Sequence, residues 1–121
     1  MWFAYWVVAG ALAALFLAAG ATKLVRSRPA LAASGMRYVD DFTDGQVKLI
    51  GVAEIMGAVG LIVPMLTGIA AVLSPVAAAA LTVLMAGAVA THTRRDETFM
   101  VPLVLAVASA GVAVLGILLL G

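Results

Sequence analysis

The chain has 121 residues, of which 65% are hydrophobic and 11% are charged, and its formal net charge is +1. Soluble domains have about 45–50% apolar and about 25% charged residues, so this composition excludes a soluble fold and indicates one membrane-embedded domain. The lack of cysteine excludes disulfides and thiol-ligated clusters within the chain, the single histidine argues against an all-protein metal site, and the small net charge gives no reason to expect nucleic acid as a partner.

The first apolar segment, residues 2–24, is long enough to cross a bilayer, which takes about 20 helical residues. Trp2, Tyr5 and Trp6 stand at its start, where aromatic side chains typically anchor a helix in the membrane interface. A signal peptide is the competing interpretation, but the segment lacks a charged beginning and its apolar run is too long. A stripe of small residues on this helix is suited to close helix packing: Gly10, Ala14, Ala18 and Ala21.

Residues 25–46 form the only long connection, and Pro29 prevents the first helix from continuing into it. Its part from 29 to 42 mixes apolar residues, Tyr38 among them, with charged residues such as Arg37. This pattern fits a short helix lying in the membrane interface, and it fits an ordinary surface loop equally well. Both alternatives stay open at this point.

The second helix is predicted over residues 44–66. Thr43 and Gln46 have the spacing of a capping box, and Phe42 and Val47 have that of a hydrophobic staple. Three residues mark the end of this helix: Pro64, Thr67 and Gly68.

Glu54 is the only carboxylate inside the apolar run from 47 to 64. An ionisable side chain within a membrane helix is costly, so by default it indicates a functional site. Glu54 lies about 90° around the helix from a stripe that should pack against a neighbour. This stripe consists of small residues and a proline: Ala53, Gly57, Gly60 and Pro64. We therefore expect the carboxylate in a helix–helix seam or a cavity rather than against lipid.

The third and fourth helices are predicted over residues 75–92 and 99–120. Ser74 followed by Pro75 fits an N-cap with proline at the first helical position. Small residues at helical spacing should be buried along the fourth helix: Pro102, Ala106, Ser109, Ala113 and Gly116. The predicted fold class is thus an all-α membrane protein, a four-transmembrane-helix bundle that forms a single domain over residues 1–121.

The distribution of positive charge predicts the orientation. All seven Lys and Arg residues lie in or beside the first and third connections, residues 25–46 and 93–98. With four spans, these two connections share one side of the membrane. The positive-inside rule places them in the cytoplasm and both termini outside.

Two long runs carry a family resemblance: residues 48–64 read KLIGVAEIMGAVGLIVP, and residues 74–97 read SPVAAAALTVLMAGAVATHTRRDE. Together with GATKL at 20–24 and TG at 67–68, they resemble the DoxX-like family of small bacterial membrane proteins. The resemblance implies a four-helix bundle in the bacterial inner membrane and an association with membrane redox systems, including a quinone-linked thiosulfate oxidoreductase. Its wider relatives include membrane enzymes that isomerise or cyclise lipophilic substrates, so the resemblance leaves the reaction open.

Three helices are expected to bring polar side chains to one membrane depth. Glu54 lies about 10 Å along its helix from Val47, and Lys23 and His92 end the first and third helices on the same side. These three are the candidate catalytic residues, with the carboxylate accepting or delivering a proton. The candidate ligand-binding residues are Lys23, Glu54, Thr91, His92 and Arg94. The alternatives are an interhelical ion pair that only fixes packing, and a topogenic role for Arg94.

Three classes of function remain open. The first is a non-catalytic subunit of a membrane redox complex, with a quinone as the implied cofactor and none held by the chain itself. The second is a membrane enzyme that uses Glu54 as acid or base on a lipophilic substrate. The third is a proton-coupled exporter, because small multidrug transporters also have four helices and one membrane glutamate. The expected partners are the lipid bilayer, a second copy or a partner subunit, and a lipophilic small molecule.

Overall fold

The computed structural model describes all residues, 1–121, and contains helices but no strand. The long helices are α1 (Trp2–Val25), α3 (Asp44–Thr67), α4 (Leu73–Arg94) and α5 (Met100–Leu120). Two short helices lie between α1 and α3, namely α2 (Arg28–Ala33) and the 3-10 helix η1 (Arg37–Asp41). Each of these four helices is long and apolar enough to cross a membrane. The predicted all-α fold with four apolar spans is confirmed, and the helix bounds lie within two residues of the expected ranges.

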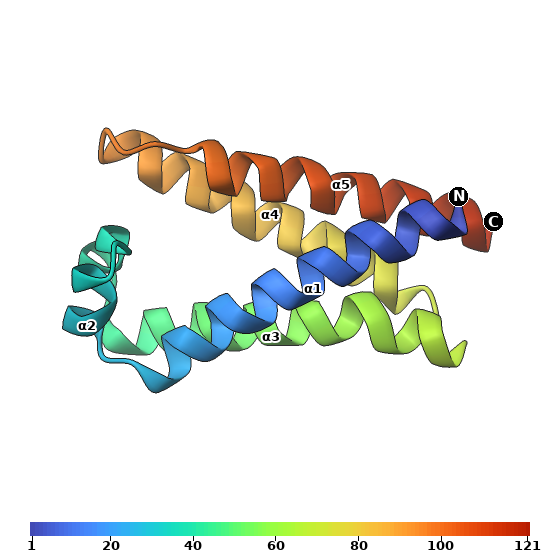
Figure 1. Cartoon of the computed structure of the whole chain (residues 1–121), viewed down its shortest axis with the longest axis horizontal. Coiled ribbons are helices and arrows are strands. Elements are labelled where there is room, and N and C mark those ends of the chain that lie inside the picture. Colours follow the sequence, from blue (N-terminus) through green and yellow to red (C-terminus); the bar gives the residue numbers. More distant parts are fainter.

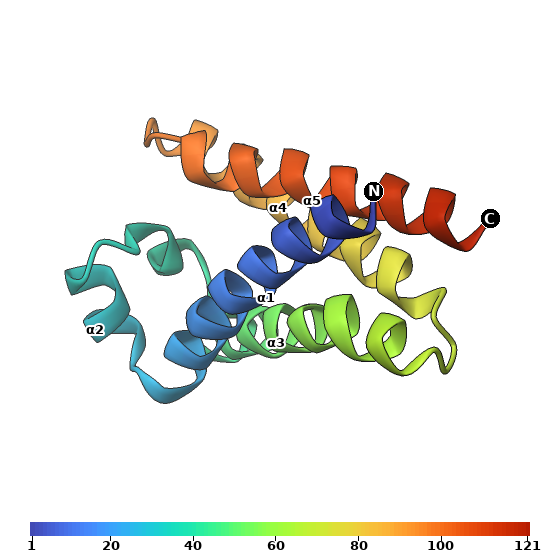
Figure 2. The ribbon, with the colours of Figure 1, turned by 45° about the vertical axis from the view of Figure 1, so that its right-hand side comes forward.

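The four long helices alternate in direction along the long axis of the molecule (Figure 1). α1 packs mainly against α3, and α4 packs mainly against α5, so the bundle consists of two helix pairs. Figure 2 shows the same two pairs from another angle, with α2 and η1 at one end of the bundle. The α4–α5 connection lies at that same end, whereas both termini and the α3–α4 connection lie at the opposite end (Figure 1).

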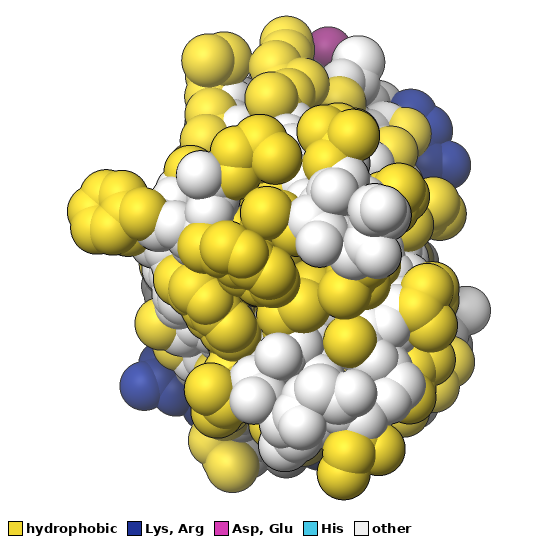
Figure 3. Space-filling model, turned by 90° about the vertical axis from the view of Figure 1, so that its right-hand side faces the viewer, with side chains coloured by type: hydrophobic (Ala, Val, Ile, Leu, Met, Phe, Trp, Pro, Cys, Tyr) yellow, Lys and Arg dark blue, Asp and Glu magenta, His cyan; other side chains and the backbone are white.

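The end that carries the termini presents almost no charge. Seen from this end, the surface is made of hydrophobic and uncharged side chains, and charged ones appear only at its margin (Figure 3). Large apolar side chains are also exposed along the long helices, among them Leu15, Val63, Val83 and Val107. In a bilayer these side chains contact lipid instead of water, as expected for helices that are apolar on every face.

The small-residue stripe predicted on α5 packs inside the bundle. Pro102, Ser109 and Gly116 are buried, and a Cβ on Gly116 would lie 3.2 Å from a carbon of Pro75 in α4. In the stripe predicted on α3, Gly57 is also buried, whereas Ala53, the first residue of that stripe, is exposed.

The stripe predicted on α1 does not pack within the chain, because Gly10, Ala14, Ala18 and Ala21 are all exposed. The buried face of α1 instead carries both of its buried polar side chains, Tyr5 and Lys23. A hydroxyl or an ammonium group in lipid costs far more than an exposed alanine, so the polar residues determine which face turns inward.

Both ends of α3 follow the sequence signals. The backbone N–H of Gln46 donates to Thr43 Oγ1 over 3.1 Å, and that of Thr43 donates to Gln46 Oε1 over 2.9 Å, which completes the capping box. The helix ends at Gly68, whose φ of 73° is the left-handed conformation that glycine adopts without a Cβ clash. Pro64 lies inside the last turns of α3 and does not end it.

The predicted N-cap at Ser74 is wrong, since α4 begins at Leu73 and Ser74 is buried in its first turn. Ser74 Oγ accepts a hydrogen bond from the backbone N–H of Met65 over 3.1 Å. Close by along α3, the hydroxyl of Tyr5 donates to the carbonyl oxygen of Leu61 over 2.9 Å. Tyr5 is therefore fully buried and is not an interfacial anchor. Both side chains satisfy backbone groups near the proline of α3, which is how a membrane helix accommodates a proline.

The segment between α1 and α3 is folded, so the surface-loop alternative is wrong. α2 and η1 enclose a small separate core made of Leu31, Val39 and Val47. This core fixes η1 against the beginning of α3. The segment lies at one end of the bundle, which also carries the end of α1, the beginning of α3 and the end of α4 (Figure 2). This end holds all seven Lys and Arg residues of the chain and is called the basic end below.

Candidate functional site

A buried ion pair joins α1 to α3. Lys23 Nζ lies 2.7 Å from Glu54 Oε1, and each side chain is only 4% exposed. The carboxylate thus lies in a helix–helix seam, as the helical spacing predicts. Buried charges of opposite sign at this distance hold one another in place, and neither contacts lipid.

Two glycines bring the helices close enough for this pair to form. Gly20 and Gly51 each precede a member of the pair by three residues, or about one helical turn. A Cβ on Gly20 would lie 2.6 Å from the carbonyl oxygen of Gly51, and a Cβ on Gly51 would lie 3.0 Å from the Cβ of Lys23. Only glycine at both positions permits this close approach of the two backbones.

A cavity of about 530 Å³ lies beside the ion pair, at the basic end of the molecule. Of its 18 lining residues, 10 are hydrophobic, and they come from all four long helices and from the segment between α1 and α3. The lining side chains with polar groups are Lys23, Tyr38, Glu54, Thr91, His92 and Thr98. A mainly apolar wall with a few polar groups, enclosing this volume, is typical of a small-molecule site.

Tyr38 connects the two sides of this cavity. Its ring centroid lies 5.9 Å from Lys23 Nζ on one side and 5.1 Å from the ring centroid of His92 on the other. The sequence pattern identifies Tyr38 only as one apolar residue of the long connection. In the sequence, the one feature that points to Tyr38 is that an aromatic residue follows Arg37 and stands two positions before Asp40.

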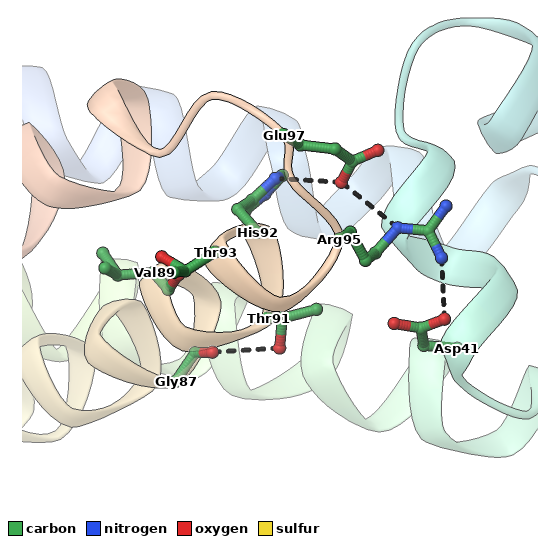
Figure 4. A network of polar contacts seen from close by, with 8 residues as sticks. All are labelled: Asp41, Gly87, Val89, Thr91, His92, Thr93, Arg95 and Glu97. Atoms are coloured by element: carbon green, nitrogen blue, oxygen red, sulfur yellow. Dashed lines mark hydrogen bonds and ion pairs between the residues drawn. The ribbon is translucent and has the colours of Figure 1, made fainter.

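A chain of polar contacts links the end of α4 to η1 (Figure 4). His92 Nδ1 lies 3.3 Å from Glu97 Oε1, which accepts a hydrogen bond from Arg95 Nε over 3.2 Å. Arg95 Nη1 donates to Asp41 Oδ1 over 2.7 Å. Desolvation lowers the pKa of Arg95, but its bonds and charge interactions with Asp41 and Glu97 outweigh this and raise that pKa above its usual value. The α4–α5 connection is therefore tied to the segment that covers the cavity.

Four of the five predicted ligand-binding residues line the same cavity: Lys23, Glu54, Thr91 and His92. The hydroxyl of Thr91 donates to the carbonyl oxygen of Gly87 within α4, over 3.0 Å. Arg94 lies apart, because it is exposed and about 200° around α4 from His92. The structure contains no group of three His, Asp or Glu side chains that could hold a metal ion. The lining residues of the cavity offer hydrogen bonds and apolar contacts.

Comparison with known proteins identifies one relationship. A model of the DoxX-like family matches residues 7–117, which is nearly the whole chain and includes every residue that lines the cavity. No curated protein and no solved structure matches the chain. The resemblance read from the sequence is thereby confirmed.

Proposed function

The chain belongs to the DoxX-like family and is a multi-pass membrane protein, and from this premise we propose that its cavity binds a lipophilic molecule with a polar head group, such as a quinone. One observation carries the proposal. The cavity of about 530 Å³ is mainly apolar, and the buried pair of Lys23 and Glu54 forms part of its wall. A quinone needs apolar contacts for its ring and tail and hydrogen-bond donors for its carbonyl oxygens.

Each polar side chain of the wall has a defined role in this proposal. An ammonium group has three N–H donors, and the ion pair with Glu54 uses one, so Lys23 retains donors for a head-group oxygen. Glu54 holds the ammonium group at its depth and compensates its charge. The rings of Tyr38 and His92 provide flat surfaces on which a quinone ring can stack.

A binding measurement tests the proposal. We expect the protein, purified in mild detergent, to retain a lipophilic molecule that mass spectrometry identifies after extraction. A short-tailed quinone should then bind saturably, and Tyr38→Ala should weaken its affinity by about tenfold through loss of one aromatic contact. Arg94→Ala is the matched control, since Arg94 lies at the same end but outside the cavity. The absence of both a retained molecule and saturable quinone binding would refute the proposal.

The wider proposal is that the protein is a non-catalytic partner in a membrane redox complex. The chain has no cysteine and one histidine, so electron carriers would come from a partner subunit or from the bound quinone. Association with a second copy or another membrane subunit is part of this proposal. The exposed small residues of α1 support it, because such residues allow a further helix to approach closely.

A membrane enzyme is the second candidate function. One observation favours it, namely that Glu54 Oε1 lies in the cavity wall and has no hydrogen-bond partner apart from its ion pair with Lys23. A carboxylate in this position is suited to exchange a proton with a bound lipophilic substrate. Turnover of such a substrate that disappears in Glu54→Gln would favour the enzyme, whereas quinone binding without turnover would favour the first proposal.

We also propose that the basic end faces the cytoplasm at the bacterial inner membrane, with both termini outside. The cysteine-free chain allows a direct test with single cysteines at Arg37 and Thr67, which are exposed at opposite ends. An impermeant maleimide should label position 67 but not 37 in intact spheroplasts, and both positions after permeabilisation. Labelling of position 37 alone before permeabilisation would reverse the proposed orientation.

A further inference from the structure

A second cleft lies at the basic end of the molecule, between the end of α1 and the beginning of α3. Its volume is about 270 Å³, and only one of its eight lining residues is hydrophobic. Its charged lining residues are Lys23, Arg26, Arg28, Asp44 and Lys48. Apart from Lys23, no residue of this cleft lines the cavity discussed above. The proposed function therefore leaves this cleft unexplained.

Most of the positive charge in this cleft is not compensated by the protein. Arg26 forms no side-chain hydrogen bond or ion pair, and Lys48 Nζ donates only to the carbonyl oxygen of Leu24, over 3.1 Å. Arg28 Nε lies 3.3 Å from Asp44 Oδ1, in a pair whose carboxylate side chain is 71% exposed. Lys23 is neutralised by its buried partner. Arg26, Arg28 and Lys48 carry three positive charges, and Asp44 carries one negative charge. The cleft therefore has a net charge of +2, which favours binding of an anion.

An exposed apolar stripe begins at the same cleft. On α3, Lys48 is followed at helical spacing by Val52, Met56, Val59 and Val63, which are all exposed. At 1.5 Å per residue, the stripe extends about 22 Å from the cleft along the helix. Half the hydrocarbon thickness of a bilayer is about 15 Å, so the stripe can accommodate a complete acyl chain.

We propose that this cleft binds the phosphate group of an anionic phospholipid whose acyl chain lies along the exposed stripe of α3. Arg26, Arg28 and Lys48 donate charge-assisted hydrogen bonds to the phosphate oxygens. A zwitterionic lipid brings its own positive group to this basic cleft and is disfavoured. Inorganic phosphate offers the same oxygens without the apolar part, so it binds more weakly than the lipid.

Native mass spectrometry of the full chain in mild detergent tests this assignment. The delipidated protein is titrated with phosphatidylglycerol, with phosphatidylcholine of the same acyl chains, and with inorganic phosphate. We expect phosphatidylglycerol to bind most tightly. Removing both unpaired charges with Arg26→Gln and Lys48→Gln should weaken its binding by about 25-fold, at about fivefold per charge. Neither residue lines the larger cavity, so quinone binding should stay unchanged.

The matched control removes two charges from the same end of the molecule but outside the cleft. Arg37 and Arg94 are exposed and form no side-chain bond, so their double replacement by glutamine should leave lipid affinity unchanged. The proposal would be overturned if both double variants lost the same affinity for phosphatidylglycerol. It would also be overturned if phosphatidylglycerol and phosphatidylcholine bound equally well. Phosphate binding as tight as that of phosphatidylglycerol would reassign the cleft to a free anion. If the first double variant has a lowered melting temperature, the single variant Arg26→Gln should still bind phosphatidylglycerol about fivefold more weakly than the unmodified protein. Unchanged affinity in this single variant would refute the lipid site.

Discussion

Replacing Glu54 with glutamine is expected to lower the stability of the protein by about 3–5 kcal/mol, because the change leaves a buried ammonium group without its counter-charge. Lys23 Nζ and Glu54 Oε1 lie 2.7 Å apart, and each side chain is only 4% exposed, so bulk water compensates little of the lost charge. The effect should appear as a lower melting temperature in detergent. Quinone binding should weaken in the same variant, since Lys23 lines the cavity.

A double variant separates the structural role of this pair from its role in binding. Lys23→Met combined with Glu54→Gln removes both charges at similar volume, and such replacements of buried pairs are often neutral or stabilising. We expect this double variant to have a melting temperature close to that of the unmodified protein but to bind no ligand. Restored stability with restored binding would mean that the pair serves packing alone. A Glu54→Gln protein unchanged in both measurements would contradict both roles.

Gly20→Ala is expected to force α1 and α3 apart at their closest approach. The new Cβ would lie 2.6 Å from the carbonyl oxygen of Gly51, and because this neighbour is backbone, a rotamer change cannot relieve the clash. Overpacking of this kind costs about 1–3 kcal/mol. Lys23 lies one turn further along α1, so its contact with Glu54 and the affinity for a ligand should weaken together.

Gly10→Ala on the same helix is the matched control for this experiment. No atom of the chain lies within 4 Å of the position that its Cβ would take, so in the monomer only the gain in helix propensity remains, which is up to about 1 kcal/mol of stabilisation. The two alanine variants should therefore shift the melting temperature in opposite directions. Equal shifts would show that the glycine contact does not hold the helix pair together.

Local sequence patterns were sufficient to predict the four long helices of this fold. A membrane span needs about 20 apolar residues, a requirement that each long helix meets within its own segment. The capping box at Thr43 and the left-handed Gly68 depend on residues only a few positions apart, so the bounds of α3 could be read directly. Helical periodicity also predicted that Glu54 points away from lipid, where it is indeed buried, because a charged side chain in contact with lipid is costly.

The contacts between helices could not be read in this way. Lipid is as apolar as most of these side chains, so hydrophobicity does not distinguish a packed helix face from an exposed one. The pairing of α1 with α3 selected Lys23, and not His92, as the partner of Glu54. The same packing turned the small residues of α1 outward, buried Ser74 beside Met65, and brought Tyr38 over the cavity. The sequence therefore specifies where each helix lies along the chain, whereas the rotation and pairing of the helices specify which side chains form the site.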